Sequence, residues 1–301
     1  MEAAWLEDFI ALAECMNFSR AAERRNVTQP AFSRRIRALE AWVGAPLFDR
    51  DTHRLALTPA GDAFHPVAEE ALHLLQRGRK AAVEAARGAS GELTFLATHA
   101  LSLTFFPAWL RTLEGAVADS AVRLAADNME ACERMMLEGR GQFFLCHHHP
   151  AAPSRLDASG FLSVTLGADT LIPVCGRDGE GRPLHALPGT KEAPVPYLAF
   201  SAESGMGRIV EAARAAGGPA AVLKPVFTSH LSTALKMLAA DGRGVAYAPL
   251  SLAADDLEPG GRLARAGGEE WDIPMEIRLL RPKARMTPAA EAFWKAAAGG
   301  L

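Results

Sequence analysis

The chain has 301 residues, of which 49% are hydrophobic and 22% charged, and its net charge is −3. This composition is typical of a globular protein of about two or three domains and argues against a disordered chain. No apolar run reaches the roughly 18–20 residues that span a bilayer. The first eight residues carry three acids, where a secretion signal carries bases. We therefore expect a cytoplasmic protein that does not enter the membrane.

The four cysteines, at positions 15, 132, 146 and 175, are far apart and form no CxxC pair. A disulfide scaffold or a zinc knuckle is therefore not expected, and isolated cysteines of this kind are mostly small buried hydrophobes. The sequence also lacks the G-x-S-x-G, P-loop and H-E-x-x-H motifs. We expect no enzyme activity, no metal and no cofactor.

Basic residues gather near the N-terminus, where residues 20–37 hold six arginines and one glutamate. Such a cluster is either a solvated helix face or a stripe that contacts phosphates. The net charge of the whole chain hides this local concentration.

The residues around these arginines predict three helices. Apolar residues recur at helical spacing over residues 3–15. Ser19 is a candidate N-cap for a short helix over residues 20–25. Thr28 is a candidate N-cap for a third helix that runs to about residue 43, with a proline in its first turn, where the missing N–H costs nothing. Two helices joined by a tight turn are the geometry of a helix-turn-helix motif.

The third helix and the segment that follows it carry residue types that contact DNA. Gln and Arg side chains read adenine and guanine edges in the major groove. Two short strands over residues 47–50 and 54–58 predict a wing around a polar tip. Arg50 and Arg54 in this wing could reach phosphates or a minor groove.

Four segments of this region resemble the LysR-type transcriptional regulators: FSRAA (18–22), TQPAFSRRIRALE (28–40), GAPLFDR (44–50) and LTPAG (57–61). The resemblance covers residues 1–61. It implies a winged helix-turn-helix, a linker helix that dimerises, and a periplasmic-binding-protein-like α/β effector domain of two subdomains. It also implies a sequence-specific regulator that binds double-stranded DNA. Mapped onto this chain, the DNA contacts fall on Gln29, Pro30, Ser33, Arg34, Arg37, Arg50 and Arg54.

Thr58 and Pro59 predict the start of a long helix that runs to about residue 87. A small-residue heptad seam lies along it, at Phe64, Ala68, Ala71, Leu75, Gly78, Ala82 and Ala85. The seam packs either on its own domain or on a partner helix. The resemblance favours a partner helix, which would give a homodimer, or a homotetramer if the effector domain also associates. Pro66 should kink the helix or shift its start.

From residue 92 onward, strands alternate with helices, which predicts parallel sheets with helical crossovers. The expected strands cover residues 93–97, 122–126, 143–146, 169–174, 197–200, 244–249 and 277–280. The expected helices cover residues 105–113, 130–137, 208–216, 232–240 and 288–298. We therefore divide the chain into a DNA-binding domain (1–58), a linker helix (59–88) and a two-lobed effector domain (92–301).

Ligands of such sheets bind beyond the carboxyl ends of the strands, at helix N-termini that favour anions. The polar and sulfur side chains at these places predict a cleft between the lobes. Its expected lining is Thr98, His99, Ser102, Asn128, Ser201, Ser204, Met206 and His230. The main hypothesis is that a small polar or anionic effector binds there and controls DNA binding.

The run Cys146-His147-His148-His149-Pro150 admits a metal-site interpretation. A structural zinc needs about four ligands, and the neighbouring sequence offers no second cluster of Cys and His. Where the resemblance is followed, the run falls at the hinge between the two lobes. We therefore expect a hinge position here.

Three effector-half segments resemble one branch of the family, the hypochlorite-responsive regulators: ATHALSL (97–103), LCHHHP (145–150) and SGMGR (204–208). That resemblance implies an alternative switch in which an oxidant converts Met206 to its sulfoxide. A solute-binding protein or an enzyme on the same two-lobed fold is a further alternative, but it leaves residues 1–61 unexplained. The sequence leaves the effector and oxidant hypotheses both open.

Overall fold

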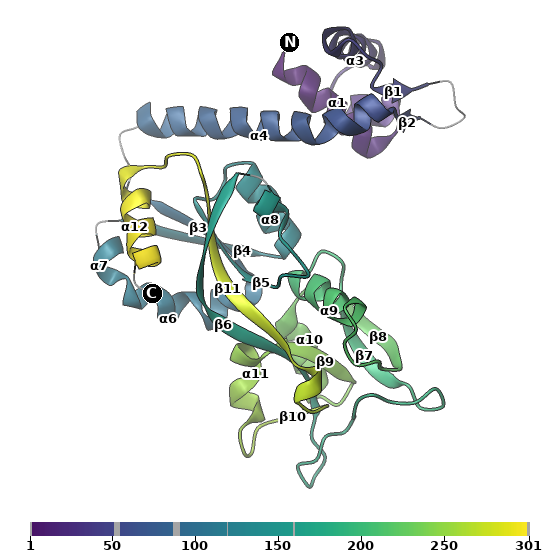
Figure 1. Cartoon of the computed structure of the whole chain (residues 1–301), viewed down its shortest axis with the longest axis vertical. Helices are drawn as coiled ribbons and strands as arrows, with labels where there is room; N and C mark the ends of the chain where they lie inside the picture. The colour runs from purple at the N-terminus through teal and green to yellow at the C-terminus, as the bar shows by residue number, and fades with distance from the viewer. Residues whose placement is uncertain (1, 51–54, 87–90, 119, 159, 300–301) are drawn as a thin grey trace. The chain divides into compact units, whose positions relative to one another are not determined.

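The computed structural model describes residues 2–50, 55–86, 91–118, 120–158 and 160–299. The chain divides into two compact units, Met1–Ala86 and Arg87–Leu301 (Figure 1). None of the described helices is both long enough and apolar enough to span a membrane. The two units are described separately below.

The first unit consists of three short helices, a small hairpin and one long helix. Its elements are α1 (Ala3–Cys15), α2 (Phe18–Arg24), α3 (Gln29–Val43), β1 (Phe48–Asp49), β2 (Ala56–Leu57) and α4 (Pro59–Ala86). Strands β1 and β2 pair antiparallel and form the predicted wing. Apolar side chains from all three short helices are fully buried in one core, among them Phe9, Phe32 and Ile36. The predicted helix-turn-helix is thus present.

The start of α2 differs from the sequence prediction. The helix begins at Phe18, and the Asn17 side chain caps it by accepting a hydrogen bond from the Arg20 N–H at 3.0 Å. Ser19 therefore lies inside the helix and is not its cap. Thr28 occupies the N-cap position of α3, but its side chain makes no capping hydrogen bond.

A buried carboxylate joins the three short helices. Asp8 of α1 is 0% exposed and accepts hydrogen bonds from Arg25 Nε at 2.8 Å and from Arg35 Nη1 at 3.3 Å. Two arginines of the predicted phosphate-contacting stripe thus neutralise an internal acid. The basic cluster is in part a structural feature of the domain.

Helix α4 begins as predicted, because the Thr58 Oγ1 accepts a hydrogen bond from the Gly61 N–H at 3.0 Å. Pro66 lies inside the helix and does not shift its start. The predicted seam is divided. Phe64, Ala68 and Ala71 pack against the helix-turn-helix core, which is the alternative that the sequence left open, whereas Leu75 is 54% exposed. Two further apolar side chains of α4 are also exposed, Val67 and Leu74.

In the second unit, the described strands form one nine-stranded sheet in the order β4-β3-β5-β11-β6-β9-β7-β8, with β10 added to β6. The strands are β3 (Leu93–Thr98), β4 (Val122–Asp127), β5 (Phe143–His148), β6 (Phe161–Gly176), β7 (Val195–Phe200), β8 (Leu223–Ser229), β9 (Val245–Pro249), β10 (Leu263–Arg265) and β11 (Ile273–Pro282). Strand β3 is parallel to β4 and β5, and β7 is parallel to β8 and β9. The predicted parallel sheets with crossovers are therefore present.

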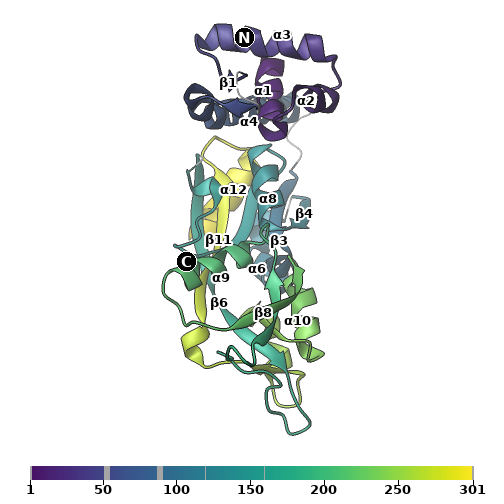
Figure 2. The same ribbon diagram turned by 90° about the vertical axis from the view of Figure 1, so that its right-hand side faces the viewer.

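The long strands β6 and β11 pair antiparallel over ten positions and belong to both halves of the sheet (Figures 1 and 2). The sequence predicted only parts of them, residues 169–174 and 277–280. In the first half of β6 only Phe161 is buried, and the other side chains are exposed or half-buried, so this half lacks the continuous apolar run that marks the second half.

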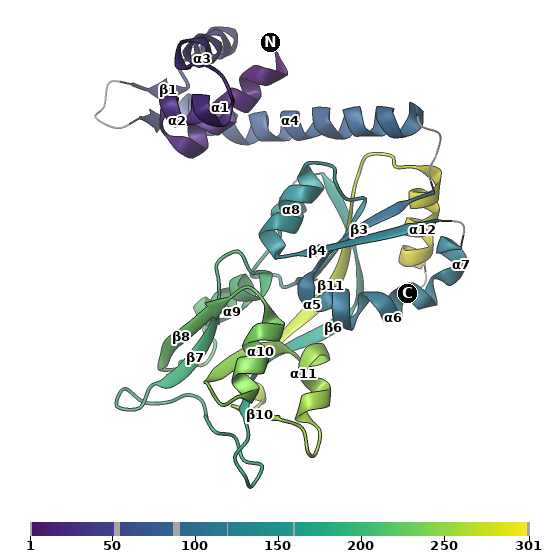
Figure 3. The same cartoon turned by 180° about the vertical axis from the view of Figure 1, so that it is seen from behind.

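Helices cover the sheet: α5 (His99–Thr104), α6 (Phe106–Thr112), α7 (Glu114–Val117), α8 (Met129–Leu137), α9 (Gly205–Ala215), α10 (Ser232–Ala240), α11 (Leu250–Leu257) and α12 (Pro288–Gly299). Short 3₁₀ turns cover Arg155–Ala158 and Glu269–Trp271. Helices α5, α7 and α11 were not predicted. We call β3–β5 with α5–α8 and α12 lobe 1, and β7–β10 with α9–α11 lobe 2 (Figure 3).

A buried ion pair joins the two lobes. Glu133 of α8 in lobe 1 is 1% exposed, and the Arg208 Nη1 of α9 in lobe 2 lies 3.1 and 3.0 Å from its two carboxylate oxygens. Glu133 also accepts hydrogen bonds from the Ser154 Oγ at 2.8 Å and from the Arg155 N–H at 3.0 Å. The contact between α8 and α9 is therefore held by charge as well as by packing.

Replacing Arg208 by Ala should lower the free energy of unfolding by about 3 kcal/mol, because it leaves the buried Glu133 carboxylate without its cation. Arg214→Ala in the same helix is the matched control. Its partner Glu211 is exposed, 72% for the side chain, so the change should stay within about 1 kcal/mol. Urea denaturation of both variants measures the difference. Equal effects would show that the interlobe pair adds nothing to stability.

Candidate functional site

The first candidate site lies at the start of α3. Gln29, Pro30, Arg34 and Arg37 are all exposed there, as a surface that contacts DNA requires. Ser33 is only 9% exposed, and its Oγ accepts a hydrogen bond from the Gln29 Nε2 at 3.2 Å. Ser33 therefore orients the Gln29 amide and does not itself lie at the front of the surface.

The wing side chain Arg50 is engaged within the domain. Its Nη2 lies 2.7 Å from the Glu40 Oε2, and its guanidinium lies over the Phe18 ring at 5.4 Å from the centroid. Arg50 thus fastens β1 to the helices, with its side chain still 38% exposed. Arg54 lies outside the described residues.

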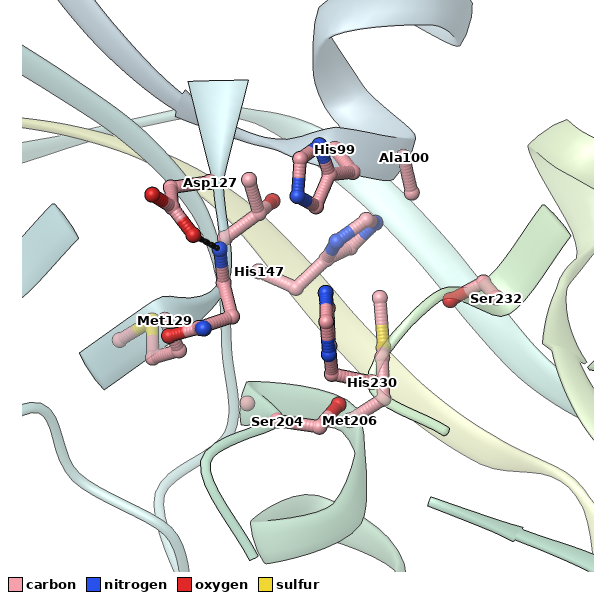
Figure 4. Close-up of a pocket in the computed structure, with 12 residues that line it drawn as sticks. His99, Ala100, Asp127, Met129, His147, Ser204, Met206, His230 and Ser232 are labelled. Atoms are coloured by element: carbon pink, nitrogen blue, oxygen red, sulfur yellow. Dashed lines mark hydrogen bonds between the residues drawn. The ribbon is translucent and has the colours of Figure 1, made fainter. Parts of the chain in front are cut away.

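The second candidate site is a cavity of about 30 Å³ between the two lobes (Figure 4). Six of the eight predicted effector residues line it: Thr98, His99, Asn128, Ser204, Met206 and His230. The lining also includes residues that the sequence did not single out for this site, among them Met129, His147 and Ser232. Both lobes contribute, so the cavity depends on how the lobes pack.

The structure does not bring the other two predicted residues to this cavity. The Ser102 Oγ donates a hydrogen bond back to the His99 carbonyl at 2.8 Å, within α5. Ser201 follows β7 and lines a separate hollow with Tyr197 and Arg208. The prediction placed both serines by their position after a strand, but their side chains take other directions.

Helix caps account for the polar residues at the cavity. The Asn128 Oδ1 accepts a hydrogen bond from the Ala131 N–H at 2.9 Å at the start of α8, and Ser204 caps α9 through the Gly207 N–H at 3.4 Å. Both helices therefore direct their first residues to the cavity, where the positive end of a helix dipole favours an anion.

Met206 is the second residue of α9 and is 7% exposed. Met206 lies between Gly205 and Gly207, and at both positions the backbone lies too close to neighbouring atoms for a larger side chain. A Cβ at Gly205 would lie 3.1 Å from the Met129 Cβ, and one at Gly207 would lie 2.9 Å from the Ser201 carbonyl oxygen. Gly205 thus lets the start of α9 approach Met129 of lobe 1, while the Met206 side chain packs with Tyr197, Ile209 and Tyr247 of lobe 2.

Two histidines face each other across the cavity. The rings of His99 in lobe 1 and His230 in lobe 2 have centroids 5.8 Å apart. Burial lowers the pKa of His99, and His230 lowers it further, although Asp127 acts in the opposite direction. His99 therefore favours its neutral form more than an exposed histidine does.

His147 is the residue at this site that sequence reasoning placed elsewhere. It is 5% exposed, and its Nε2 lies 3.0 Å from the Asp169 Oδ2 of β6. Asp169 also accepts a hydrogen bond from the Ser251 Oγ at 2.6 Å. Burial opposes the ionisation of Asp169, but hydrogen bonds from His147 and Ser251 lower its pKa. The only feature of the sequence that pointed to His147 was its place in the run of three histidines.

That histidine run is not the passage between the lobes. It ends β5, which pairs with β11, whereas the strands shared by both lobes are β6 and β11. His148 lies on the other side of β5 from the cavity, where its Nε2 is 3.2 Å from the Arg278 Nη1. Within the described ranges, no three His, Cys, Asp or Glu side chains are grouped to hold a metal ion.

Two cysteines lie behind the cavity wall in the lobe 1 core, Cys132 and Cys146. They are 0% and 2% exposed. Burial raises the pKa of Cys132 to about 12 and also raises that of Cys146. Both thiols are therefore protonated at neutral pH.

Comparison with known proteins identifies both units. The family described as "Bacterial regulatory helix-turn-helix protein, lysR family" matches residues 3–62, and "LysR substrate binding domain" matches residues 86–301. The HTH-type transcriptional regulator YjiE of Escherichia coli (strain K12) is 33% identical over 298 residues, which are 98% of this chain and 93% of that protein.

Solved structures agree. Full-length HypT from Salmonella typhimurium, a hypochlorite-specific LysR-type transcriptional regulator, matches with a TM-score of 0.59 and 33% identity over 99% of this chain and 98% of that one. Its regulatory domain has also been solved with a bromide ion bound. DarR of Vibrio fischeri in complex with DNA matches with a TM-score of 0.57 and 30% identity over 99% and 98% of the two chains. The chain therefore belongs to the LysR family of transcriptional regulators, which are not enzymes, and it consists of a DNA-binding helix-turn-helix and an effector-binding domain.

Proposed function

We propose that this regulator is switched by an oxidant of the hypochlorous acid class, which converts Met206 to methionine sulfoxide in the interlobe cavity. The observation that carries the proposal is the position of Met206. It is a buried thioether, 7% exposed, on the wall of a cavity built from both lobes.

The size of the cavity favours the oxidant over an organic effector. One water needs about 10–15 Å³ of such volume, so a cavity of about 30 Å³ admits a ligand of two or three heavy atoms. Pockets for drug-sized ligands are about 300–1,000 Å³. Of the two hypotheses from the sequence, the anionic effector fits this cavity as a small inorganic ion without a movement of the lobes.

Oxidation of Met206 would also affect the contact between the two lobes. The sulfoxide is polar where the thioether is apolar, and a buried polar group without a partner is unfavourable. Met206 packs with Tyr197, Ile209 and Tyr247 and lies one helical turn or less from Arg208. Displacing the start of α9 therefore strains the Arg208–Glu133 pair that joins the lobes.

The relatives support the same proposal. HypT, the hypochlorite-specific regulator, is similar to this chain over nearly its whole length, and its regulatory domain has been solved with a bromide ion bound.

Mild hypochlorite treatment should change operator binding of the wild type but not of Met206→Leu. Leucine keeps the apolar volume and cannot be oxidised. Trypsin releases Met206 in the peptide 192–208 and Met237 in the peptide 237–243, so mass spectrometry assigns the added oxygen. Met237→Leu is the control, because Met237 is 60% exposed on α10 and lies outside the cavity. If Met206→Leu responds as the wild type does, the proposal is wrong.

The exposed face of α3 is proposed to read DNA. Gln29→Ala and Arg34→Ala should each weaken specific binding by about 1–3 kcal/mol and relax the base preference. Arg54→Ala, a wing variant, should instead lower affinity for all sequences about equally. Gel-shift titrations on operator and scrambled duplexes measure both effects. Unchanged specificity in Arg34→Ala would contradict the assignment of α3 as the recognition helix.

We further propose that α4 forms a homodimer, with a homotetramer following if effector domains also associate. Val67, Leu74 and Leu75 are 58%, 58% and 54% exposed on this helix, and such apolar side chains stabilise a helix pair when a partner covers them. Leu75→Glu should shift the mass measured by light scattering toward the monomer, because a desolvated charge is costly. Leu184→Glu, at an exposed position outside α4, is the control. A wild-type monomer at micromolar concentration would refute the proposal.

A further inference from the structure

The run of three histidines contains one buried residue that the interlobe cavity does not use. His148 is the last residue of β5 and is 9% exposed. Its ring lies beside charged groups of two other elements, Glu276 and Arg278 of β11 and Asp157 of the 3₁₀ turn. A buried ionisable ring among three charges can change its protonation near neutral pH, so these contacts decide when it does.

Arg278 fixes the tautomer of the neutral ring. Its Nη1 lies 3.2 Å from the His148 Nε2, and because a guanidinium can only donate, Nε2 accepts and the ring proton is on Nδ1. This Nδ1 is buried and makes no hydrogen bond within the described part of the chain. The Glu276 Oε2 lies 3.8 Å away, beyond hydrogen-bond distance. The neutral ring therefore has an unsatisfied N–H donor, which is unfavourable.

The same surroundings suit the imidazolium. Each of its two N–H groups faces a carboxylate, because Nε2 lies 3.7 Å from the Asp157 Oδ2 and Nδ1 lies 3.8 Å from the Glu276 Oε2. A movement of about 1 Å brings either pair to the length of a charge-assisted hydrogen bond. Arg278 must then turn away from Nε2, and its Nε already donates to Glu276 at 2.6 Å. One arginine and two acids leave a net negative charge, which the imidazolium balances.

Burial and charge act on the pKa of His148 in opposite directions. Burial lowers this pKa most, and Arg278 lowers it further, whereas Asp157 and Glu276 raise it. The adjacent His149 also lowers it. The pKa therefore lies below the ordinary value of about 6.5, and the ring takes up its second proton only in acid.

The carboxylate that the imidazolium attracts already supports the 3₁₀ turn. The Asp157 Oδ2, the oxygen near His148, accepts the Ser154 N–H at 2.8 Å. The Ser154 Oγ in turn donates to the Glu133 Oε1 at 2.8 Å. Glu133 is the buried acid that pairs with Arg208 across the lobes. A continuous chain of contacts thus leads from the His148 ring to the interlobe ion pair.

We propose that His148 is a proton-operated switch of the contact between the lobes. While the ring is neutral, Asp157 supports the turn that holds Glu133. When the ring is charged, it draws the Asp157 carboxylate away from the Ser154 N–H, and Glu133 is held less firmly for its pair with Arg208. Acid therefore loosens the interlobe contact. The signal is a proton and needs no oxidation, so the switch is independent of the proposed function.

Hydrogen–deuterium exchange at the histidine C2 position, followed by mass spectrometry, measures the pKa of single histidines in the full-length protein. Trypsin releases the histidine run in the peptide 141–155, and fragmentation separates its three rings. The pKa of His148 should lie below about 6.5. Arg278→Gln should raise it by about one pH unit, because the neighbouring cation is lost. Asp157→Asn should lower it by a similar amount, because the imidazolium loses an anion.

Thermal melting of the full-length protein tests the link to the lobes. The loss in Tm caused by Arg208→Ala is measured at about pH 7.5 and about pH 5.5, on either side of the ordinary histidine pKa. In the wild-type background this loss should be about half as large in acid, because the ion pair is already loosened. In His148→Gln it should be equal at both pH values, since glutamine accepts the Arg278 hydrogen bond and takes up no proton. His149→Gln, a half-buried neighbour, should behave as the wild type does.

Either of two results overturns the proposal: a loss from Arg208→Ala that is the same at both pH values in the wild-type background, or a His148 pKa that neither Arg278→Gln nor Asp157→Asn changes. If His148→Gln does not fold, Asp157→Asn replaces it. This variant should also make the loss independent of pH, because the ring has no carboxylate to draw from the turn. Met206→Leu should keep the pH response of the wild type, which separates this switch from the proposed oxidant switch.

Discussion

The interlobe cavity depends on two strands that belong to both lobes. Strands β6 and β11 run side by side through the whole effector domain, and their pairing shifts register between Ile277 and Arg278. Both strands are continuous from one lobe to the other. The lobes can therefore change their relative orientation only if the β6–β11 pair, here called the ribbon, bends or twists. Each lobe therefore keeps its own wall of the cavity, and small changes at the walls become changes in the angle between the lobes.

Two buried carboxylates, Asp169 and Glu133, lie at contacts between the lobes. Asp169 lies within β6 and contacts both lobes, while Glu133 holds Arg208 across the gap between α8 and α9. Both acids are nearly inaccessible to solvent, so each needs its partners in place. Met206 and His147 lie next to these pairs, which puts the chemistry of the cavity beside the contacts that hold the lobes together.

The sequence predicted what local patterns encode. Helical spacing placed the helix-turn-helix and most helices, and polar residues such as Asn128 and Ser204 pointed to the cavity. What it missed depends on partners far along the chain. Asp169 lies 22 residues from His147 in an apolar strand, and Asp8 lies 17 and 27 residues from the arginines that it binds. The sequence around Arg25 and Arg35 resembles that around the exposed arginines of the same segment. Only the folded structure shows which arginines bind Asp8.

The buried cysteines have a consequence for the oxidant switch proposed above. Peroxide-type reagents react with thiolates, and burial keeps Cys132 and Cys146 as thiols. A thioether has no proton to lose, so the nucleophilicity of Met206 does not depend on ionisation. Burial therefore lowers the reactivity of the thiols of Cys132 and Cys146. It does not change the ionisation of the Met206 thioether, which has none. Under the proposed oxidant switch, discrimination between oxidants therefore follows from acid–base chemistry in the protein core, before any difference in binding.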